Sequence, residues 1–122
     1  MERWRGERLY QRLLEQNADG ERYVLHDGPP YANGDVHLGT ALNKIIKDVI
    51  VKRQMMAGRR APYVPGWDCH GMPIEHQVLR KLGNKAREMP QLEIRRRCRE
   101  FAEKYVDVQR EQFQRLGVLG DW

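Results

Sequence analysis

The sequence predicts an α/β fold in which a parallel sheet is flanked by helices. Two short runs, residues 22–26 and 61–64, contain the valine and tyrosine that are typical of strands. Each run leads through a loop rich in glycine and proline into a stretch with helical periodicity. This repeated order of strand, loop and helix indicates parallel strands with a right-handed crossover. Because two short strands do not make a stable sheet alone, we expect further strands outside these residues.

Composition indicates a folded domain. The chain has 122 residues, of which 40% are hydrophobic and three are tryptophan, which argues against disorder. The net charge of +5 would suit an anionic ligand, but most basic residues share helices with acids, which indicates solvated helix faces. The two cysteines are far apart and form no C-x-x-C pair. We therefore expect a reduced, cytoplasmic protein with neither a disulfide framework nor a structural metal.

The N-terminal segment predicts a helical extension. Residues 2–16 place leucines and a tryptophan among charges at helical spacing, and the segment ends at Gly20. The segment has no secretory signal, and no apolar run approaches the roughly 20 residues of a membrane span. The sequence therefore predicts neither export nor membrane insertion.

Three further helices are expected along the chain. Residues 37–57 and 92–116 have long helical patterns, and residues 74–82 form a shorter one with Pro73 in its first turn. In the first of these helices Lys44, Lys47 and Asp48 lie opposite an apolar face. That face is formed by Leu38, Ala41, Leu42, Ile45, Ile46, Val49 and Ile50.

The first loop, residues 27–36, ends where a helix begins with His37. A helix N-terminus has unpaired N–H groups and attracts phosphate. The segment Gly34-Asp-Val-His-Leu-Gly39 has the spacing of a phosphate loop, but Thr40 and Ala41 follow where lysine and serine or threonine are required. His37 therefore either stabilises charge on a phosphate in transit or caps the helix.

The second loop, residues 65–73, contains Trp67, Asp68, Cys69 and His70. A carboxylate such as Asp68 suits a substrate ammonium group, although aspartate is also a common turn residue. Cys69, His70 and His76 do not have the spacing of a metal motif. Since both loops follow expected strands, they should face one pocket beyond the strand ends.

These loops resemble those of one enzyme family. The segment Pro30-Tyr-Ala-Asn-Gly-Asp-Val-His-Leu-Gly-Thr-Ala41 resembles the His-x-Gly-His signature of class I aminoacyl-tRNA synthetases, with Thr40 in place of the second histidine. Within that class, His26-Asp-Gly-Pro-Pro-Tyr-Ala-Asn-Gly34 and Pro62-Tyr-Val-Pro-Gly-Trp-Asp-Cys-His-Gly-Met-Pro-Ile-Glu75 are similar to the isoleucyl branch. The resemblance extends from about Trp4 to Trp122.

The resemblance implies a fold and a domain organisation. It implies the first half of a Rossmann-type, HUP-like parallel sheet with flanking helices, an N-terminal helix and a long C-terminal helix. Residues 1–20 would be an N-terminal helical extension, and residues 21–122 the N-terminal half of an incomplete catalytic domain.

The resemblance also implies roles for particular residues. His37 and Thr40 would be catalytic, and Asp68 would bind the α-ammonium group of the amino acid beside a pocket wall of Gly28 and Pro29. ATP would be bound by Asn33, Gly34, His37, Gly39 and Thr40. Magnesium would come with ATP, held largely through phosphate oxygens.

The activity implied is that of an isoleucine-tRNA ligase. Isoleucine and ATP would give isoleucyl-adenylate, and the full-length, monomeric enzyme would transfer isoleucine to tRNA(Ile). The chain lacks a Lys-Met-Ser-Lys-Ser loop, an editing domain and an anticodon-binding domain, so we expect it to be deficient alone. The alternative is a non-catalytic module that binds ATP or an amino acid, or docks on a partner through its arginine-rich last helix. Contact of that helix with tRNA is a third possibility.

Overall fold

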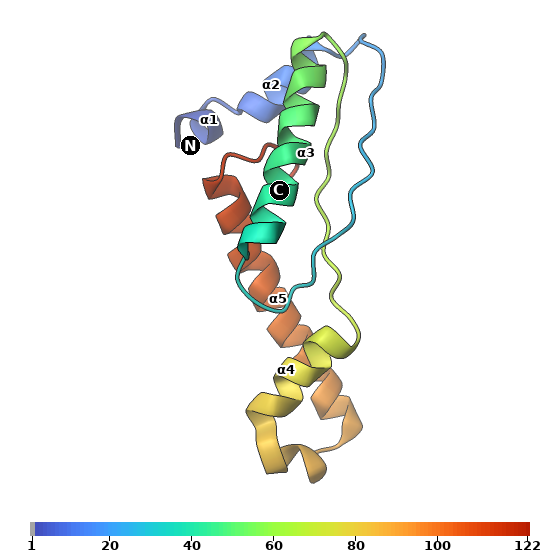
Figure 1. Cartoon of the computed structure of the whole chain (residues 1–122), viewed down its shortest axis with the longest axis vertical. Helices are drawn as coiled ribbons and strands as arrows, with labels where there is room; N and C mark the ends of the chain where they lie inside the picture. Colours follow the sequence, from blue (N-terminus) through green and yellow to red (C-terminus); the bar gives the residue numbers. More distant parts are fainter. Residues whose placement is uncertain (1) are drawn as a thin grey trace. The chain divides into compact units, whose positions relative to one another are not determined.

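The computed structural model describes residues 2–122 as helices joined by extended segments (Figure 1). The elements are α1 (Glu2–Gly6), α2 (Leu9–Gln16), α3 (Leu38–Met56), α4 (Met72–Leu82), the 3-10 helix η1 (Gly83–Arg87) and α5 (Gln91–Arg115). None of the helices in these residues is both long and apolar enough to cross a membrane.

The chain divides into two compact units. The first contains the chain up to Gly28, Val36–Pro65 and Glu111–Trp122, and the second contains Pro29–Asp35 and Gly66–Arg110. The first unit is built around α3, and its buried apolar side chains come from α2, α3, the segment after α3 and the C-terminal residues. They are Tyr10, Val51, Met55, Ala61, Tyr63, Phe113 and Val118.

The second unit has a smaller core between α4, α5 and the first loop. Ile74 of α4, Ala102 of α5 and Ala32 are its fully enclosed members. Trp67 and Phe101 pack against them. Both helices were predicted from the sequence, and Pro73 lies in the first turn of α4 as expected.

The predicted parallel sheet, and with it the Rossmann-type, HUP-like fold class, is wrong for this structure. Residues 2–122 form no strand and no sheet, and contain only two isolated parallel bridges: Arg22 with Arg60, at the start of the expected strands, and Tyr31 with Asp68, between the two predicted loops. At the first bridge Tyr23 N–H donates to Arg60 at 2.9 Å, and Arg60 N–H donates to Glu21 at 3.0 Å.

Proline explains why the two bridges do not extend into a ladder. Pro29 and Pro30 interrupt one extended segment, and Pro62 and Pro65 interrupt the other. Proline has no N–H to donate, so each of these positions removes a possible ladder hydrogen bond. Each unit contains one of the two bridges. Within residues 2–122, no neighbouring strand stabilises the two extended segments.

The N-terminal segment forms two helices where one was predicted. The helix α1 ends at Gly6, and α2 begins at Leu9. Arg8 between them has a φ of 50°, in the left-handed region. Glycine is a weak helix former, and a left-handed residue cannot continue a right-handed helix, so the amphipathic pattern is divided at this point.

The helix α3 has the predicted extent, but the prediction of which face is buried is wrong. Lys44 and Asp48, expected on the solvated side, are buried, and most of the apolar residues opposite them are exposed. The charged face is buried because it has specific partners: Asp48 accepts a hydrogen bond from Leu119 N–H at 2.9 Å, and Lys52 donates to the Gly117 carbonyl at 2.9 Å. Lys44 has partners of its own, described below.

Candidate functional site

His37 is the N-cap of α3. Its Nδ1 accepts hydrogen bonds from the backbone N–H groups of Gly39, at 3.1 Å, and Thr40, at 3.3 Å. Its Nε2 lies 2.9 Å from the Thr40 hydroxyl oxygen. Since Nδ1 accepts, the ring proton lies on Nε2, which donates to that hydroxyl. The Thr40 hydroxyl therefore keeps its own proton to donate elsewhere.

This arrangement is the capping role that the sequence left open for His37. The exposed ring occupies the N–H groups that a phosphate would need at this helix end. An anion can approach those N–H groups only when the ring turns away, and the Nε2–H of the ring can then donate to it. The catalytic role of His37 stays a prediction.

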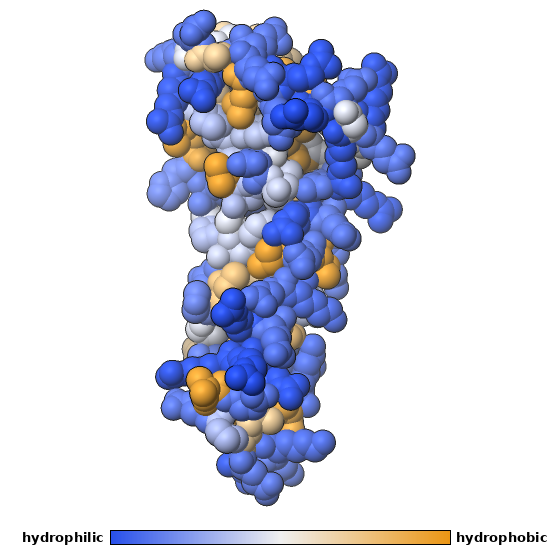
Figure 2. All heavy atoms as spheres, turned by 180° about the vertical axis from the view of Figure 1, so that it is seen from behind, coloured by the Kyte–Doolittle hydropathy of each residue, from blue (hydrophilic) through white to orange (hydrophobic). Residues whose placement is uncertain are grey.

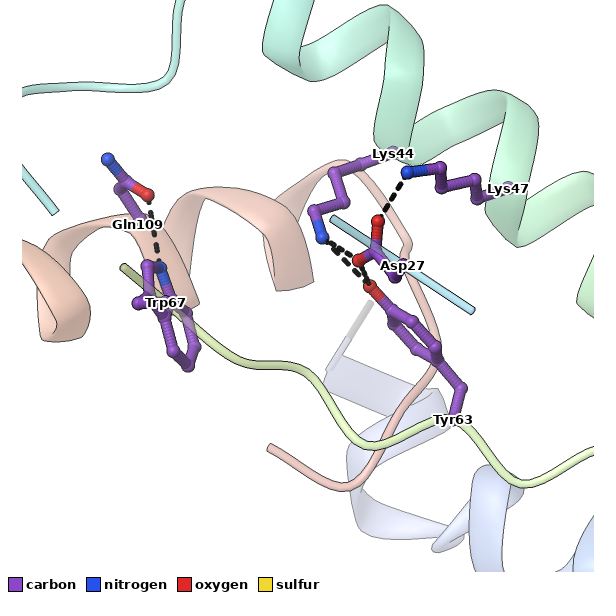
Figure 3. A network of polar contacts seen from close by, with 6 residues as sticks. All are labelled: Asp27, Lys44, Lys47, Tyr63, Trp67 and Gln109. Carbon is purple, nitrogen blue, oxygen red and sulfur yellow. Dashed lines mark hydrogen bonds and ion pairs between the residues drawn. The ribbon is translucent and has the colours of Figure 1, made fainter. Parts of the chain in front are cut away.

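A polar network connects Asp27, the residue before Gly28, to α3 (Figure 3). The Asp27 carboxylate pairs with Lys44 and Lys47, which lie on successive turns of α3. Tyr63 donates from its hydroxyl to Asp27 at 2.6 Å and accepts from Lys44 at 3.0 Å. The network thus joins three segments of the first unit: the start of the first loop, α3, and the extended segment after α3.

The network changes the acidity of its members. Burial alone would raise the pKa of Asp27, but hydrogen bonds from Lys44, Lys47 and Tyr63 outweigh it and lower that pKa below its usual value. Burial first, and then the bond and charge of Asp27, raises the pKa of Tyr63 above its usual range. Asp27 is therefore charged and Tyr63 neutral at neutral pH. The Lys44 ammonium also lies 5.7 Å from the ring centre of Phe113, within cation–π range.

Gln109 of α5 performs a similar task in the second unit. Its amide nitrogen donates to the carbonyl oxygens of Tyr31, at 3.0 Å, and Gly34, at 2.7 Å. Its amide oxygen accepts from the Trp67 indole N–H at 3.0 Å (Figure 3). Gln109 is only 3% exposed, so these bonds are shielded from water. One buried side chain therefore fixes both predicted loops within this unit.

Asp68 lies next to Trp67 in the second loop. Its backbone N–H donates to Pro30 at 2.9 Å, and its carbonyl accepts from Ala32 N–H at 3.0 Å. Its carboxylate accepts from His70 N–H at 3.2 Å, which is the turn role that the sequence left open. The half-buried side chain still has a second oxygen with which to bind a cation.

The predicted site residues fall into two groups. The first unit contains Gly28, His37, Gly39 and Thr40, of which the last three are in hydrogen-bond contact. The second unit contains Pro29, Asn33, Gly34 and Asp68, where Gln109 joins Gly34 to the loop that carries Asp68. The expectation that all of them line one pocket stays a prediction.

Sequence reasoning missed the residues that hold these groups in place, namely Asp27, Lys44, Tyr63 and Gln109. A signal for the first network was present. Lys44, Asp48 and Lys52 recur at intervals of four residues, and Lys47 lies three residues after Lys44, which places them on one helix face. We interpreted that face as solvated, because nothing local identifies Asp27 as its partner. Gln109 had no sequence signal at all.

Within residues 2–122, no group of three or more histidine, cysteine, aspartate or glutamate side chains is placed to hold a metal ion. Cys69 and Cys98 are both free thiols. Burial, followed by the charge of Asp68, raises the pKa of the Cys69 thiol, so it is a poor nucleophile at neutral pH.

Comparison with known proteins gives one consistent result. The family described as tRNA synthetases class I (I, L, M and V) matches residues 1–122. Proteins named isoleucine–tRNA ligase from Thermotoga maritima and Thermotoga petrophila are 60% identical over 122 residues, which is 100% of this chain and 13% of each relative. A protein of the same name from Nitratidesulfovibrio vulgaris is 58% identical over 119 residues, 98% of this chain and 13% of its own length. The chain therefore belongs to the class I tRNA synthetases of the isoleucine, leucine, methionine and valine group.

Proposed function

We propose that these residues are the N-terminal part of the catalytic region of an isoleucine–tRNA ligase. The observation that carries the proposal is the 60% identity to proteins of that name over the whole chain. The chain spans 13% of their length, so the activity belongs to a longer protein. Residues 1–20 would form a helical extension, and residues 21–122 the first half of the catalytic domain.

The proposed reaction joins isoleucine to tRNA in two steps. A carboxylate oxygen of isoleucine attacks the α-phosphorus of ATP, the bond from that phosphorus to the pyrophosphate oxygen breaks, and isoleucyl-adenylate forms. The isoleucyl group then passes to tRNA(Ile). Charge builds on the α-phosphate oxygens in the first step, and donors already placed at that position lower the barrier.

The N-terminus of α3 offers such donors. In the proposed mechanism the His37 ring turns from its capping position, and its Nε2–H and the Thr40 hydroxyl donate to the phosphate. The N–H groups of Gly39 and Thr40, released from the ring, point along the helix axis toward the same charge. Asn33 and Gly34 would lie along the ATP. Threonine supports this role as a donor but, unlike the second histidine of the family signature, brings no charge.

The amino acid would be bound by Asp68, with Gly28 and Pro29 beside its side chain. The half-buried position of Asp68 supports this role, because a carboxylate–ammonium pair is stronger where water is partly excluded. Magnesium would arrive with ATP and be held largely by phosphate oxygens, so this segment would not need to provide a ligand cluster. We place the protein in the cytoplasm, as the proposed role in charging tRNA suggests.

The test is isoleucine-dependent exchange between ATP and pyrophosphate. It uses both the 122-residue chain and a long chimera, which joins these 122 residues to the remainder of the Thermotoga maritima relative. In the chimera, His37→Ala should slow exchange roughly 100-fold or more, the cost of losing one transition-state donor. Asp68→Ala should raise the isoleucine KM roughly tenfold or more, because it removes a charged hydrogen bond to the substrate.

His76→Ala and Asp19→Ala are matched controls, since both side chains are exposed and lie outside the predicted site. They should leave exchange unchanged. A chimera that exchanges equally well with His37→Ala and with His76→Ala would contradict the proposed role of the α3 N-terminus. Ligand binding by the short chain, with no exchange by the chimera, would instead favour a non-catalytic module.

A further inference from the structure

Positive charge is concentrated in one short part of this chain. Residues 80–99 contain eight basic and two acidic side chains, an excess of six positive charges, whereas the whole chain has a net charge of +5. The remaining residues together therefore have a net charge of −1. The basic side chains of the segment are Arg80, Lys81, Lys85, Arg87, Arg95, Arg96, Arg97 and Arg99.

The fold brings this segment to one end of the second unit (Figure 1). It runs from the end of α4 through η1 into the first turns of α5. Gly83 has a φ of 56°, so the chain leaves the right-handed path of α4 there. The two helices lie side by side, since the Lys81 ammonium of α4 is 4.5 Å from the ring centre of Phe101 on α5. We call residues 80–99 the basic tip.

The basic tip is open to solvent. All eight of its basic residues are exposed. On the side shown in Figure 2, the lower end of the molecule, where α4 and η1 lie in Figure 1, is covered mainly by hydrophilic residues. No residue of the tip is tryptophan, tyrosine or phenylalanine. The surface therefore offers charge and hydrogen-bond donors, but no aromatic ring on which a nucleic-acid base could stack.

Much of this charge is not neutralised within the described part of the chain. Arg96 and Arg97 share the single carboxylate of Glu93, at 3.5 and 3.0 Å, so one of the two positive charges is left over. Four further cations form no ion pair within residues 2–122, namely Arg80, Lys85, Arg87 and Arg95.

The stability of the helices does not explain this crowding. Arg95 and Arg99 are one turn apart on α5, and like charges at that spacing destabilise a helix. Beyond residue 99, α5 has four acidic and three basic side chains, so its charges are nearly balanced there. The excess of positive charge is thus a property of the tip and not of α5 as a whole.

A surface of this kind fits the phosphate backbone of a nucleic acid. Six of the eight basic residues are arginine, whose planar guanidinium donates two parallel hydrogen bonds to a phosphate. The cations lie on α4, η1 and α5, so together they can contact several phosphates, which a nucleic-acid strand provides. Contacts of this type position a nucleic acid without reading its sequence.

We propose that the basic tip binds the phosphate backbone of tRNA in the longer ligase. This rests on the proposed function, which supplies an RNA substrate, and it assigns a surface that would hold that RNA. The tip is separated from the second loop, which contains Asp68, by the length of α4, about 16 Å for its 11 residues. Contacts at the tip would therefore strengthen tRNA binding and leave the formation of isoleucyl-adenylate unchanged.

Removal of the four unpaired charges in the long chimera tests the proposal. The KM for Thermotoga maritima tRNA(Ile) in charging assays should rise roughly tenfold or more, while exchange between ATP and pyrophosphate keeps its rate. In filter binding, the slope of log Kd against log salt should fall by roughly 3, because each lost phosphate contact removes about 0.7–0.9. Glutamine keeps a high helix propensity, so the tip variant combines Arg80→Gln, Lys85→Gln, Arg87→Gln and Arg95→Gln.

A control variant removes the same amount of charge from the first unit and should bind tRNA like the parent. Its four arginines are exposed and likewise form no ion pair within residues 2–122. The control combines Arg5→Gln, Arg12→Gln, Arg22→Gln and Arg53→Gln. Equal loss of tRNA affinity in the two variants would overturn the proposal, because net charge alone would then account for it. So would a tip variant that binds and charges tRNA like the parent, as expected if the tip is only solvated or docks on an acidic protein surface.

A conservative variant separates charge from folding. With Arg80→Lys, Arg87→Lys and Arg95→Lys the tip keeps all its charges, so the salt slope should stay at the parental value. Thermal unfolding followed by circular dichroism compares the stability of all variants. A lysine variant that lost as much of the slope as the glutamine variant would show a structural effect and contradict the proposal.

The outcome is separable from the proposed function. Exchange between ATP and pyrophosphate tests the first step, in which tRNA takes no part, whereas filter binding tests the tip. A chimera that binds tRNA through the tip but does not exchange supports the tip and contradicts the proposed activity. An active chimera whose tip variant keeps the parental tRNA affinity does the reverse.

Discussion

Gln109 shows how much of the second unit depends on one amide. Its amide nitrogen donates to two carbonyl oxygens, and its amide oxygen accepts from an indole N–H. The three bonds therefore require one donor atom and one acceptor atom at the end of the side chain. Glutamate has the same shape but offers two acceptors when ionised. The residue type, more than its size, is therefore required at this position.

Gln109→Glu should lower the free energy of unfolding by roughly 2 kcal/mol at pH 8, because a buried carboxylate would face two carbonyl oxygens. The loss should shrink at pH 5, where protonation restores a donor. Urea unfolding at the two pH values measures both effects. Gln54→Glu is the control: Gln54 accepts from Arg59 at 2.9 Å, a role that a carboxylate keeps. An equal loss in both variants would contradict the role assigned to the Gln109 amide nitrogen.

Asp27 makes the stability of the first unit depend on pH. Its folded pKa is lowered, so its contribution is fully present above the unfolded value of about 3.9 and is lost as pH falls through the folded pKa. Urea midpoints should therefore fall as pH drops below about 4.

Asp27→Asn should cost roughly 3 kcal/mol at pH 7, since it leaves the buried Lys44 without its counter-charge. The same substitution should flatten the acid part of the stability profile. Asp107→Asn, at an exposed carboxylate, should leave that profile unchanged. An Asp27→Asn variant with the parental acid profile would show that the network does not control acid stability.

At the scale of elements, a close approach between the ends of α2 and α3 explains why residue 20 is glycine. From the sequence alone, Gly20 indicated only the end of a helix. A Cβ on Gly20, after α2, would lie 2.1 Å from the carbonyl oxygen of Gly58, after α3. Asn17, near the end of α2, also donates to the Met55 carbonyl at 2.9 Å. The ends of α2 and α3 thus approach closely and are joined by the Asn17 side chain, and the approach leaves no room for a side chain at Gly20.

Gly20→Ala should destabilise the chain by roughly 1–3 kcal/mol, because backbone must move to admit the methyl group. Thermal unfolding followed by circular dichroism measures the change. Gly6→Ala is the matched control: nothing lies within 4 Å of its Cβ, and alanine favours the α1 helix in which it lies. If both substitutions were equally tolerated, the close approach of the two helix ends would be wrong.

The helices were predictable because their signals are local. The extents of α3, α4 and α5 follow from periodic apolar residues and from Pro73, which act within a few turns. The first helix was predicted as continuous because a left-handed Arg8 has no sequence signature. Element type is thus readable in this chain wherever no special backbone conformation intervenes.

At the scale of the whole molecule, sequence reasoning failed wherever the answer depended on distant partners. The sheet was predicted from two apolar runs, but pairing stops at single bridges because prolines remove donors and no neighbouring strand is present. The buried face of α3 was misjudged because hydrophobicity alone favours the apolar side. Asp27 and Tyr63, 17 and 19 residues from Lys44, reverse that preference.

The residues of the candidate site were chosen from the sequence, and their role as a site stays a prediction. Glycine, proline and histidine at the start of α3 indicated an anion site, and the structure brings His37, Gly39 and Thr40 together. It does so in a capping arrangement, in which the ring accepts hydrogen bonds from the helix's own N–H groups. Sequence identifies which groups are available, whereas the partner that each group takes depends on the folded geometry.

The exposed apolar side of α3 also has a consequence for synthesis. In the proposed ligase these residues belong to the N-terminal part, so they leave the ribosome well before most of the polypeptide is made. At about 5–20 residues per second, making the remainder of a relative of this length takes on the order of a minute. Throughout that time the nascent chain would present an apolar helix face to the cell, a binding target for chaperones that shield unfinished proteins.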